Sequence, residues 1–352
     1  MQHVTIALTL YMLACVLQGA VDSPYTPGHH QWAMDPSIFK IPKNLPIEDK
    51  IIEIKPSEQQ IRKRILSSQT REEIGHITIY ISRKNIDEKA IKYSQPPFRK
   101  HFKKWALSQL EKSSAKLITL TPETLEWINL KKVSEKFAQV HHDLKLHPLP
   151  KRKARQLSRR MRPFFIKKQY QSLKKKLLSK KSLRVDQHLL PSFAKRAVRH
   201  FTIFRGPNCF HASLAFQNEQ WTKLAGVNIR REKNHHKSMI NHDELDRALK
   251  QYFYPVQPPF KYGDLMVFAD LPEKPHTDLH YRWIKHAATW LFDGYVFSKG
   301  SKSPNSPWTV KTFHEEWDRW SKNTKRLGIK VFRRSQEHVK KQLPIDPVDW
   351  LY

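Results

Sequence analysis

Cysteine is nearly absent from this sequence, which limits the chemistry open to it. The 352 residues contain two cysteines, Cys15 and Cys209. Cys15 lies in an uncharged apolar stretch, VTIALTLYMLACVL (residues 4–17), which is too short to cross a bilayer and is typical of a secretory signal peptide. We therefore expect residues 1–20 to be removed on export to the periplasm, cell envelope or medium. Cys209 is then either a small buried hydrophobe or a reactive thiol without a disulfide partner.

Glycine and acidic residues are also scarce. The chain has nine glycines, and 32 Asp and Glu stand against 64 Lys and Arg, which gives a net charge of +32. Between Lys151 and Arg199 there are 18 Lys or Arg residues and one acid, Asp186. Good helix formers fill this stretch, and Pro163 and Pro191 interrupt it. The pattern predicts a basic helical segment over residues 151–199.

The basic segment has three interpretations. Its cations could neutralise the phosphates of a nucleic acid, bind an anionic lipid surface or wall polymer, or form a solvated helix face. An exported protein meets envelope polyanions more often than it meets DNA. We therefore expect an anionic surface as the partner of residues 151–199, and neither nucleic acid nor a transmembrane segment after signal removal.

Residues 21–150 carry no catalytic motif. Alternation of apolar and polar residues predicts strands at residues 51–56 and 76–82. Helical spacing predicts a helix near residues 98–112 and another from Thr121 through Val140. These elements predict an N-terminal α+β region of unknown role.

The sequence changes character at His200, because seven of the ten tryptophans follow it. Gly206-Pro207-Asn208 indicates a turn, and the apolar residues after Cys209 indicate a buried helix. Asn241 and Glu244 have the spacing of a capping box. Strand patterns follow at residues 262–270, 283–292 and 294–300, with Asp293-Gly294 as a hairpin turn. We expect an α+β domain over residues 200–352.

A cysteine at a helix N-terminus lies in the positive field of the helix dipole, which favours the thiolate. Such a nucleophile needs a proton acceptor, and histidine is the side chain best suited to that task near neutral pH. His286 lies in an otherwise apolar strand pattern. The alternative is a neutral imidazole buried for packing.

GPNC before a helix, then GDLMVF, then HAATWLFDGYVFSKG, resembles the NlpC-type members of the papain-like cysteine peptidase superfamily over about residues 200–310. The resemblance implies a cysteine-bearing helix packed on a small antiparallel sheet. It implies Cys209 as nucleophile, His286 as general base, and Ser298 as third polar residue, where family members have His, Asn or Gln. The oxyanion would be held by the Cys209 backbone N–H and the Asn208 amide, although Asn208 could equally cap the helix.

The resemblance implies a thiol hydrolase or acyltransferase acting on amide bonds, with peptidoglycan stem peptides as the substrate that family members use. A transglutaminase-like enzyme shares the order Cys then His, but its closing Asp is missing here. A non-catalytic basic protein that binds envelope polymers is the alternative from another class. We expect no cofactor and no metal, because the histidines lack further ligands at suitable spacing. They are His235, His236, His242, His276 and His280.

Overall fold

Antiparallel strands and the helices packed on them make up the computed structural model, which describes residues 32–39, 43–67, 78–81, 116–119, 129–202, 207–217, 239–272 and 283–335. The predicted α+β class is confirmed. The chain divides into two compact units. Unit 1 comprises Met1–Leu45, Asn241–Val296 and Thr312–Leu343, and unit 2 comprises Pro46–Ile240, Phe297–Lys311 and Pro344–Tyr352.

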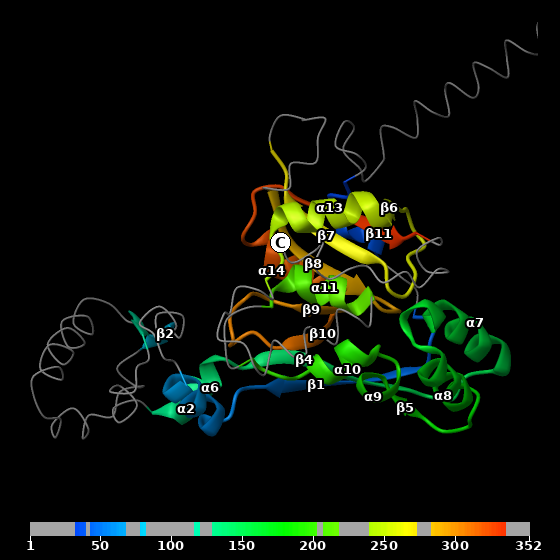
Figure 1. Ribbon diagram of the computed structural model, residues 1–352, viewed down its shortest axis with the longest axis horizontal. Helices are drawn as coiled ribbons and strands as arrows, with labels where there is room; N and C mark the ends of the chain where they lie inside the picture. Colours follow the sequence, from blue (N-terminus) through cyan, green and yellow to red (C-terminus); the bar gives the residue numbers. More distant parts are fainter. Residues whose placement is uncertain are drawn as a thin grey trace, which may run out of the picture. The chain divides into compact units, whose positions relative to one another are not determined.

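Unit 1 is organised around neighbouring strands in the order β9-β8-β7-β11-β6 (Figure 1). The strand β7 pairs antiparallel with β8 on one side and with β11 on the other, and Phe268 of β7 lies opposite His286 of β8. The elements are η1 (Pro36–Phe39), α13 (His242–Tyr252), β6 (Phe253–Pro255), β7 (Leu265–Asp270), β8 (Ile284–Trp290), β9 (Tyr295–Lys299), α14 (Phe313–Ser321) and β11 (Leu327–Arg334). The three strand patterns read from the sequence are therefore confirmed as β7, β8 and β9.

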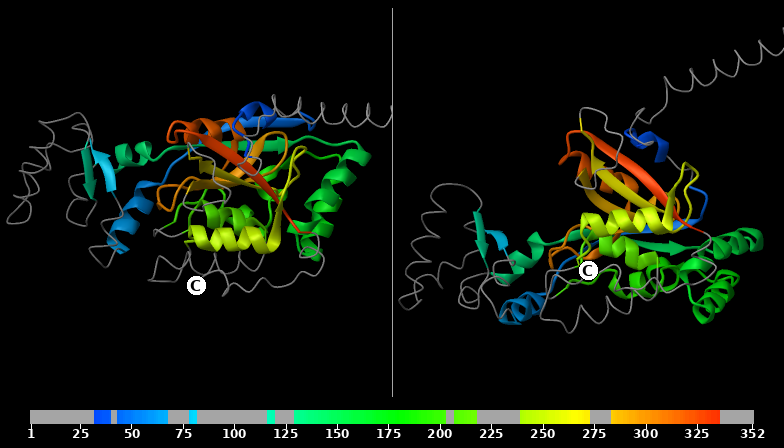
Figure 2. Two further views of the ribbon diagram at one scale, coloured as in Figure 1. Left: turned by 90° about the horizontal axis from the view of Figure 1, so that it is seen from above. Right: turned by 45° about the horizontal axis from the view of Figure 1, so that its top comes forward.

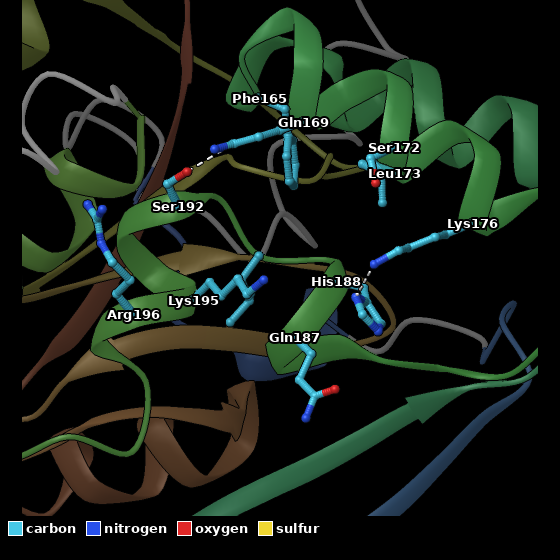
Figure 3. A pocket seen from close by; sticks show the side chains of 11 residues that line it. Phe165, Gln169, Ser172, Leu173, Lys176, Gln187, His188, Ser192, Lys195 and Arg196 are labelled. Carbon is cyan, nitrogen blue, oxygen red and sulfur yellow. Dashed lines mark hydrogen bonds between the residues drawn. The ribbon is translucent and has the colours of Figure 1, made fainter.

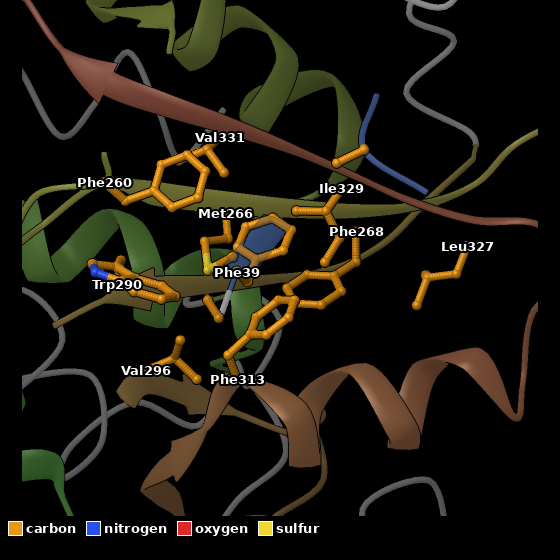
Figure 4. Packing of buried hydrophobic residues seen from close by; sticks show 12 residues of the cluster. Phe39, Phe260, Met266, Phe268, Trp290, Val296, Phe313, Leu327, Ile329 and Val331 are labelled. Atoms are coloured by element: carbon orange, nitrogen blue, oxygen red, sulfur yellow. The ribbon is translucent and has the colours of Figure 1, made fainter. Parts of the chain in front are cut away.

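The core of unit 1 lies on one face of this sheet. Side chains of alternate residues on β7, β8 and β11 pack against Phe39 of η1 and Phe313 of α14, whose rings are 4.1 Å apart (Figure 4). The helices α13 and α14 lie on opposite faces of the sheet (Figure 2). Side chains alternate along a strand, so His286 shares its face with Ala288 and Trp290 of this core.

Two local signals in unit 1 form as predicted. Asn241 caps α13, and its side chain accepts a hydrogen bond from the Glu244 N–H, whose own carboxylate accepts from the Asn241 N–H. Asp293 and Gly294 both have positive φ, 48° and 84°, as a two-residue hairpin turn requires. The Asp293 carboxylate also accepts a hydrogen bond from the Leu45 N–H at 2.7 Å.

Unit 2 contains a three-stranded antiparallel sheet in the order β1-β4-β5 and a separate β2-β3 pair. Its elements are β1 (Ile47–Ile54), α2 (Glu58–Ser67), β2 (Thr78–Ile81), β3 (Lys116–Thr119), α6 (Leu130–Lys136), β4 (Gln139–Leu146), α7 (Lys151–Met161), η4 (Arg162–Phe164), α8 (Lys167–Leu177), β5 (Leu183–Arg184), α9 (Val185–His188), α10 (Ser192–Ala197), α11 (Cys209–Gln217) and most of β10 (Trp308–Thr312). The strand β9 runs from unit 1 into this unit, where β10 is its neighbour.

The predicted helix from Thr121 through Val140 is wrong at its end. The helix α6 stops at Lys136, and Val140 lies on β4, where it pairs with Glu53 of β1. The apolar positions continued at helical spacing into β4, but pairing with a complementary strand outweighs so short a periodicity. Thr121 and residues 98–112 lie outside the described residues.

The basic segment is largely helical, as expected, and two of its breaks fall at the two prolines. A further break, at residues 178–184, contains the strand β5 and no proline. Pro163 lies in the short 3₁₀ helix η4 between α7 and α8, and Pro191 caps α10. Both long helices bury apolar residues on one side, namely Ala154, Leu157, Met161, Leu173 and Leu177. Their cations are exposed on the other: Lys151, Arg152, Lys153, Arg155, Arg159, Arg160, Arg162, Lys167, Lys168, Lys174, Lys175 and Lys176. Among the described helices, none has the length and apolar character to cross a membrane.

Candidate thiol site

Cys209 is the first residue of α11, as the sequence predicted. All nine residues of α11 are buried, and Cys209 is a thiol rather than half of a disulfide. The uninterrupted apolar run that begins at Cys209 explains why the whole helix is buried. The backbone N–H groups of the first helical turn lie beside the sulfur-bearing residue, where they favour negative charge.

Asn208 holds the start of this helix in place. Its side-chain oxygen accepts a hydrogen bond from the His211 N–H at 3.0 Å, which is a helix cap. Its side-chain amide donates to the Ile240 carbonyl oxygen at 2.7 Å. The cap, which the sequence left as the alternative, is therefore formed. One bond from the amide expected to face an oxyanion is made to Ile240, and the oxyanion roles of the Asn208 amide and the Cys209 N–H stay predictions.

His286 lies at the centre of the unit 1 sheet with no exposed surface. Its Nε2 atom is 3.4 Å from Oε2 of Glu316 on α14, and Glu316 is equally buried. The imidazole stacks on the Trp320 ring, with centroids 4.7 Å apart and planes 20° from parallel. The Trp320 indole N–H donates to the same carboxylate oxygen at 3.2 Å. A carboxylate and an aromatic ring on one helix therefore fix the position of the imidazole.

Such an arrangement can stabilise a charged histidine. A carboxylate next to an imidazole fixes its orientation and offsets the positive charge that appears when the ring takes up a proton. Burial strengthens this interaction, because the surroundings polarise less than water does. Glu316 is therefore placed where it would offset a positive charge on His286.

Glu316 is a site residue that the sequence reasoning missed. It follows Glu315, whose carboxylate belongs to the capping box that Thr312 opens. The spacing of Phe313, Glu316 and Trp320 places them on one face of α14. An acidic residue on the apolar face of an amphipathic helix was the signal that could have found it.

Ser298 and Lys299 lie on β9 and are both completely buried. The expected alternation of side chains agrees with the contacts, because Phe297 packs on Phe193, and Lys299 lies over the Trp308 ring that Phe193 also contacts. The Lys299 ammonium group donates to the backbone oxygens of Ser301 and Ser303 at 2.6 and 2.9 Å. No described contact with His286 supports Ser298 as third residue, and that role stays a prediction.

A second histidine lies close to the thiol in sequence. His211, on the second position after Cys209, is buried, and burial together with the cation of Lys299 lowers its pKa to about 4. It is therefore neutral at pH 7. Side chains two positions apart on a helix point in different directions, so His211 does not replace His286 as the proposed partner.

The structure assigns the four predicted residues to two units. Asn208, Cys209 and Ser298 belong to unit 2, and His286 belongs to unit 1. Asn208 and Cys209 lie together as cap and first residue of α11, and His286 lies with Glu316. The pairing of Cys209 with His286 stays a prediction.

The histidines considered for metal binding give no site in the described part of the chain. His242 contacts the Ile284 carbonyl oxygen through Nε2 at 2.9 Å. His235, His236, His276 and His280 lie outside the described residues. Among the residues that are described, no three of His, Cys, Asp or Glu gather as metal ligands.

Comparison with known proteins identifies no relative. No family model, no curated protein and no solved structure matches the chain. The function therefore has to be argued from the residues themselves.

Proposed function

We propose that this chain is an exported, papain-like thiol enzyme that hydrolyses amide bonds or transfers their acyl group, with Cys209 as nucleophile. The observation that carries the proposal is the buried pair of His286 and Glu316, 3.4 Å apart. Removing a carboxylate from water costs several kcal/mol, and buried ionisable groups placed beside a charge partner are concentrated at functional sites. The resemblance to NlpC-type enzymes supports the same assignment and makes peptidoglycan stem peptides the substrate to test first.

In the proposed reaction, His286 takes the proton of the Cys209 thiol, and the sulfur attacks the amide carbonyl carbon. The backbone N–H of Cys209 donates to the oxyanion that forms. The C–N bond then breaks, and His286 gives its proton to the leaving amine. Water or an acceptor amine attacks the thioester, which releases the product and restores the thiol. Glu316 offsets the charge of His286 while the ring carries the proton.

The direct test is digestion of purified peptidoglycan, followed by mass spectrometry of the fragments. We expect cleavage of stem-peptide amide bonds by the unmodified chain and no cleavage by Cys209→Ala or His286→Ala. Ser213→Ala is the matched control, because Ser213 is buried on the same helix as Cys209 and has no proposed role. Fragments produced equally by the Cys209→Ala variant would rule out thiol catalysis.

A second candidate is binding of an anionic envelope polymer without catalysis. The exposed cations on α7, η4 and α8 favour it, because no acidic residue lies between them to neutralise their charge. Binding to anionic vesicles should then weaken steeply with salt, which screens exposed charges over about 10 Å at 0.1 M. A Cys209→Ala variant that keeps the full biological effect would favour this candidate over the enzyme.

A further inference from the structure

A cavity of about 300 Å³ lies within unit 2, between α8 and the segment that carries α9 and α10 (Figure 3). Three apolar side chains, Phe165, Leu173 and Leu190, form part of its wall, and all three are buried. Its size is at the lower end of the range for small-molecule sites. The cavity is therefore large enough for a small ligand with an uncharged part.

The polar part of the wall is cationic. Lys176, Lys195 and Arg196 line the cavity, and none of the described residues around it is acidic. Asp186, the one acid of the basic segment, is engaged elsewhere: its carboxylate lies 3.2 Å from Arg184 and 3.0 Å from Arg199. The described wall therefore contributes three cations and no carboxylate.

His188 contacts one of these cations. Its Nδ1 atom is 3.1 Å from the Lys176 ammonium group. Burial, followed by the cations of Lys176 and Lys195, lowers the pKa of His188, against a smaller opposing effect of Asp186. The imidazole therefore accepts a hydrogen bond from Lys176 in its neutral form. An anion in the cavity would offset the mutual repulsion of the two ammonium groups.

Hydroxyl and amide groups complete the wall. The Ser192 hydroxyl donates to the side-chain oxygen of Gln169 at 2.9 Å, which joins α10 to α8 across the cavity (Figure 3). This bond leaves the Gln169 amide N–H groups as donors. The cavity thus combines three cations, neutral donors and an apolar surface in one place.

We propose that this cavity binds a phosphate ester, whose phosphate oxygens accept hydrogen bonds from Lys176, Lys195 and Arg196 while its uncharged part rests on Phe165, Leu173 and Leu190. A phosphate offers more acceptor oxygens and more charge than a carboxylate, which suits three cations better than one. The ester is either a small soluble molecule or the headgroup of a phospholipid. This site is independent of the thiol chemistry proposed for Cys209.

The test measures binding of glycerol 3-phosphate to the full chain by calorimetry. The double variant Lys195→Ala, Arg196→Ala removes two cations of the wall, and we expect its affinity to fall at least about tenfold. The matched control is Lys174→Ala, Lys175→Ala, which removes two equally exposed cations of α8 that do not line the cavity. Its affinity should fall less than about twofold. Equal losses in the two variants would overturn the proposal, because they would show general charge attraction.

A variant without a charge change makes the test independent of electrostatics. Ser172 lies in the wall and is exposed, so Ser172→Phe should fill the cavity while leaving the fold intact, which circular dichroism checks. We expect it to abolish binding of glycerol 3-phosphate, and unchanged binding would overturn the proposal.

Vesicles distinguish the two sources of the phosphate. The parent chain and the control variant should float with phosphatidylglycerol vesicles if the ligand is a lipid headgroup. The Lys195→Ala, Arg196→Ala variant should then no longer float with them. Binding of glycerol 3-phosphate without such flotation would assign the site to a soluble ester. Absence of both kinds of binding would overturn the proposal.

Discussion

Two of the carboxylates that are buried among the described residues of unit 1, Asp264 and Glu316, have different kinds of partner. Asp264, 2% exposed, accepts hydrogen bonds from Nε and Nη2 of Arg333 at 2.8 and 2.7 Å and from the Lys261 N–H at 2.6 Å. Glu316, with no exposed surface, faces the Trp320 indole at 3.2 Å and His286 at 3.4 Å. The partner of Asp264 is an arginine, whose charge is permanent. The partner of Glu316 is a histidine, a residue type whose charge can change.

This difference separates a structural ion pair from a candidate catalytic one. Arginine keeps its proton at every accessible pH, so the short bidentate contact with Asp264 holds β11 to the start of β7 and does nothing more. Histidine gains and loses a proton near neutral pH. The contact between His286 and Glu316 therefore fits a group whose charge changes during a reaction, and the first two predictions below test the two sides of this contrast.

The largest expected effect comes from breaking the structural pair. Arg333→Ala should destabilise the protein by about 3 kcal/mol at pH 7, because it leaves a buried carboxylate without its cation. Burial already raises the pKa of Asp264, and losing Arg333 raises it further. In the folded variant Asp264 therefore takes up a proton more readily than in the unfolded chain. The loss of folding stability caused by Arg333→Ala should then become smaller as the pH falls. Urea unfolding at several pH values measures both effects.

A double variant provides the control. Asp264→Leu with Arg333→Met removes both charges, and it should be more stable than Arg333→Ala, because no buried charge is left alone. A double variant no more stable than the single one would show that the pair contributes through packing.

The features that the sequence predicted are those fixed by neighbouring residues. The capping box at Asn241 and Glu244, the Asp293-Gly294 turn and the start of α11 each depend on a few adjacent side chains. The end of α6 and the ion pair of Asp264 with Arg333 depend on residues distant in sequence. Arg333 follows Asp264 by 69 positions, and the residues next to either one do not predict the contact.

The second prediction concerns the candidate catalytic pair. Glu316→Gln keeps an acceptor for the Trp320 N–H and removes the charge that would stabilise a protonated His286. We expect amide hydrolysis to fall at least about a hundredfold, or about 2.7 kcal/mol, with a stability change below about 1 kcal/mol. The matched control is Glu315→Gln on the same helix, which keeps an acceptor for the capping box and should leave catalysis intact. Equal activity in both variants would remove Glu316 from the site.

The third prediction concerns a buried histidine whose pKa is lowered, His141. Nδ1 of His141 accepts a hydrogen bond from the Val310 N–H at 3.1 Å, and burial, followed by the Arg199 cation, lowers the His141 pKa to about 3. The unfolded chain binds a proton below about pH 6.5 and the folded chain does not. The stability from this group is thus complete above pH 6.5 and lost as the pH falls towards 3, by about 2 kcal/mol at pH 5.

His141→Asn tests this loss, because asparagine keeps an acceptor and cannot take up the proton. Unfolding at pH 7 and pH 5 should show a smaller drop for the variant than for the parent chain. The control is His147→Asn, since the His147 side chain is 43% exposed. A drop of the same size in the parent chain and in His141→Asn would contradict the assignment.

The smallest expected effect belongs to Ser298. Its hydroxyl could contribute one neutral hydrogen bond worth about 1 kcal/mol, so Ser298→Ala should lower activity no more than about fivefold. If Glu316 rather than Ser298 orients the imidazole, the variant should keep full activity in the peptidoglycan assay. A loss larger than that from Glu316→Gln would restore Ser298 as the third residue.

The candidate site shows the same limit of sequence reasoning as the fold. Cys209 and His286 were found because each stands out from its neighbours: one begins an apolar helix, and the other interrupts an apolar strand. Ser298 is predicted only from its spacing after His286 in a family pattern. Spacing alone does not determine which side chain contacts the imidazole. Glu316 is 30 positions from His286, and only packing of α14 on the sheet brings them together.

The most direct test of the central claim measures how fast iodoacetamide alkylates Cys209 between pH 5 and 9. A thiol paired with His286, which Glu316 supports, should react well below pH 8, and the His286→Ala variant should react only at higher pH. The pH profile of alkylation for Glu316→Gln should lie between those of the parent chain and His286→Ala. The profile for Ser213→Ala should match that of the parent chain. Profiles centred near the ordinary cysteine value of about 8.5, and unmoved by the His286 change, would contradict the account.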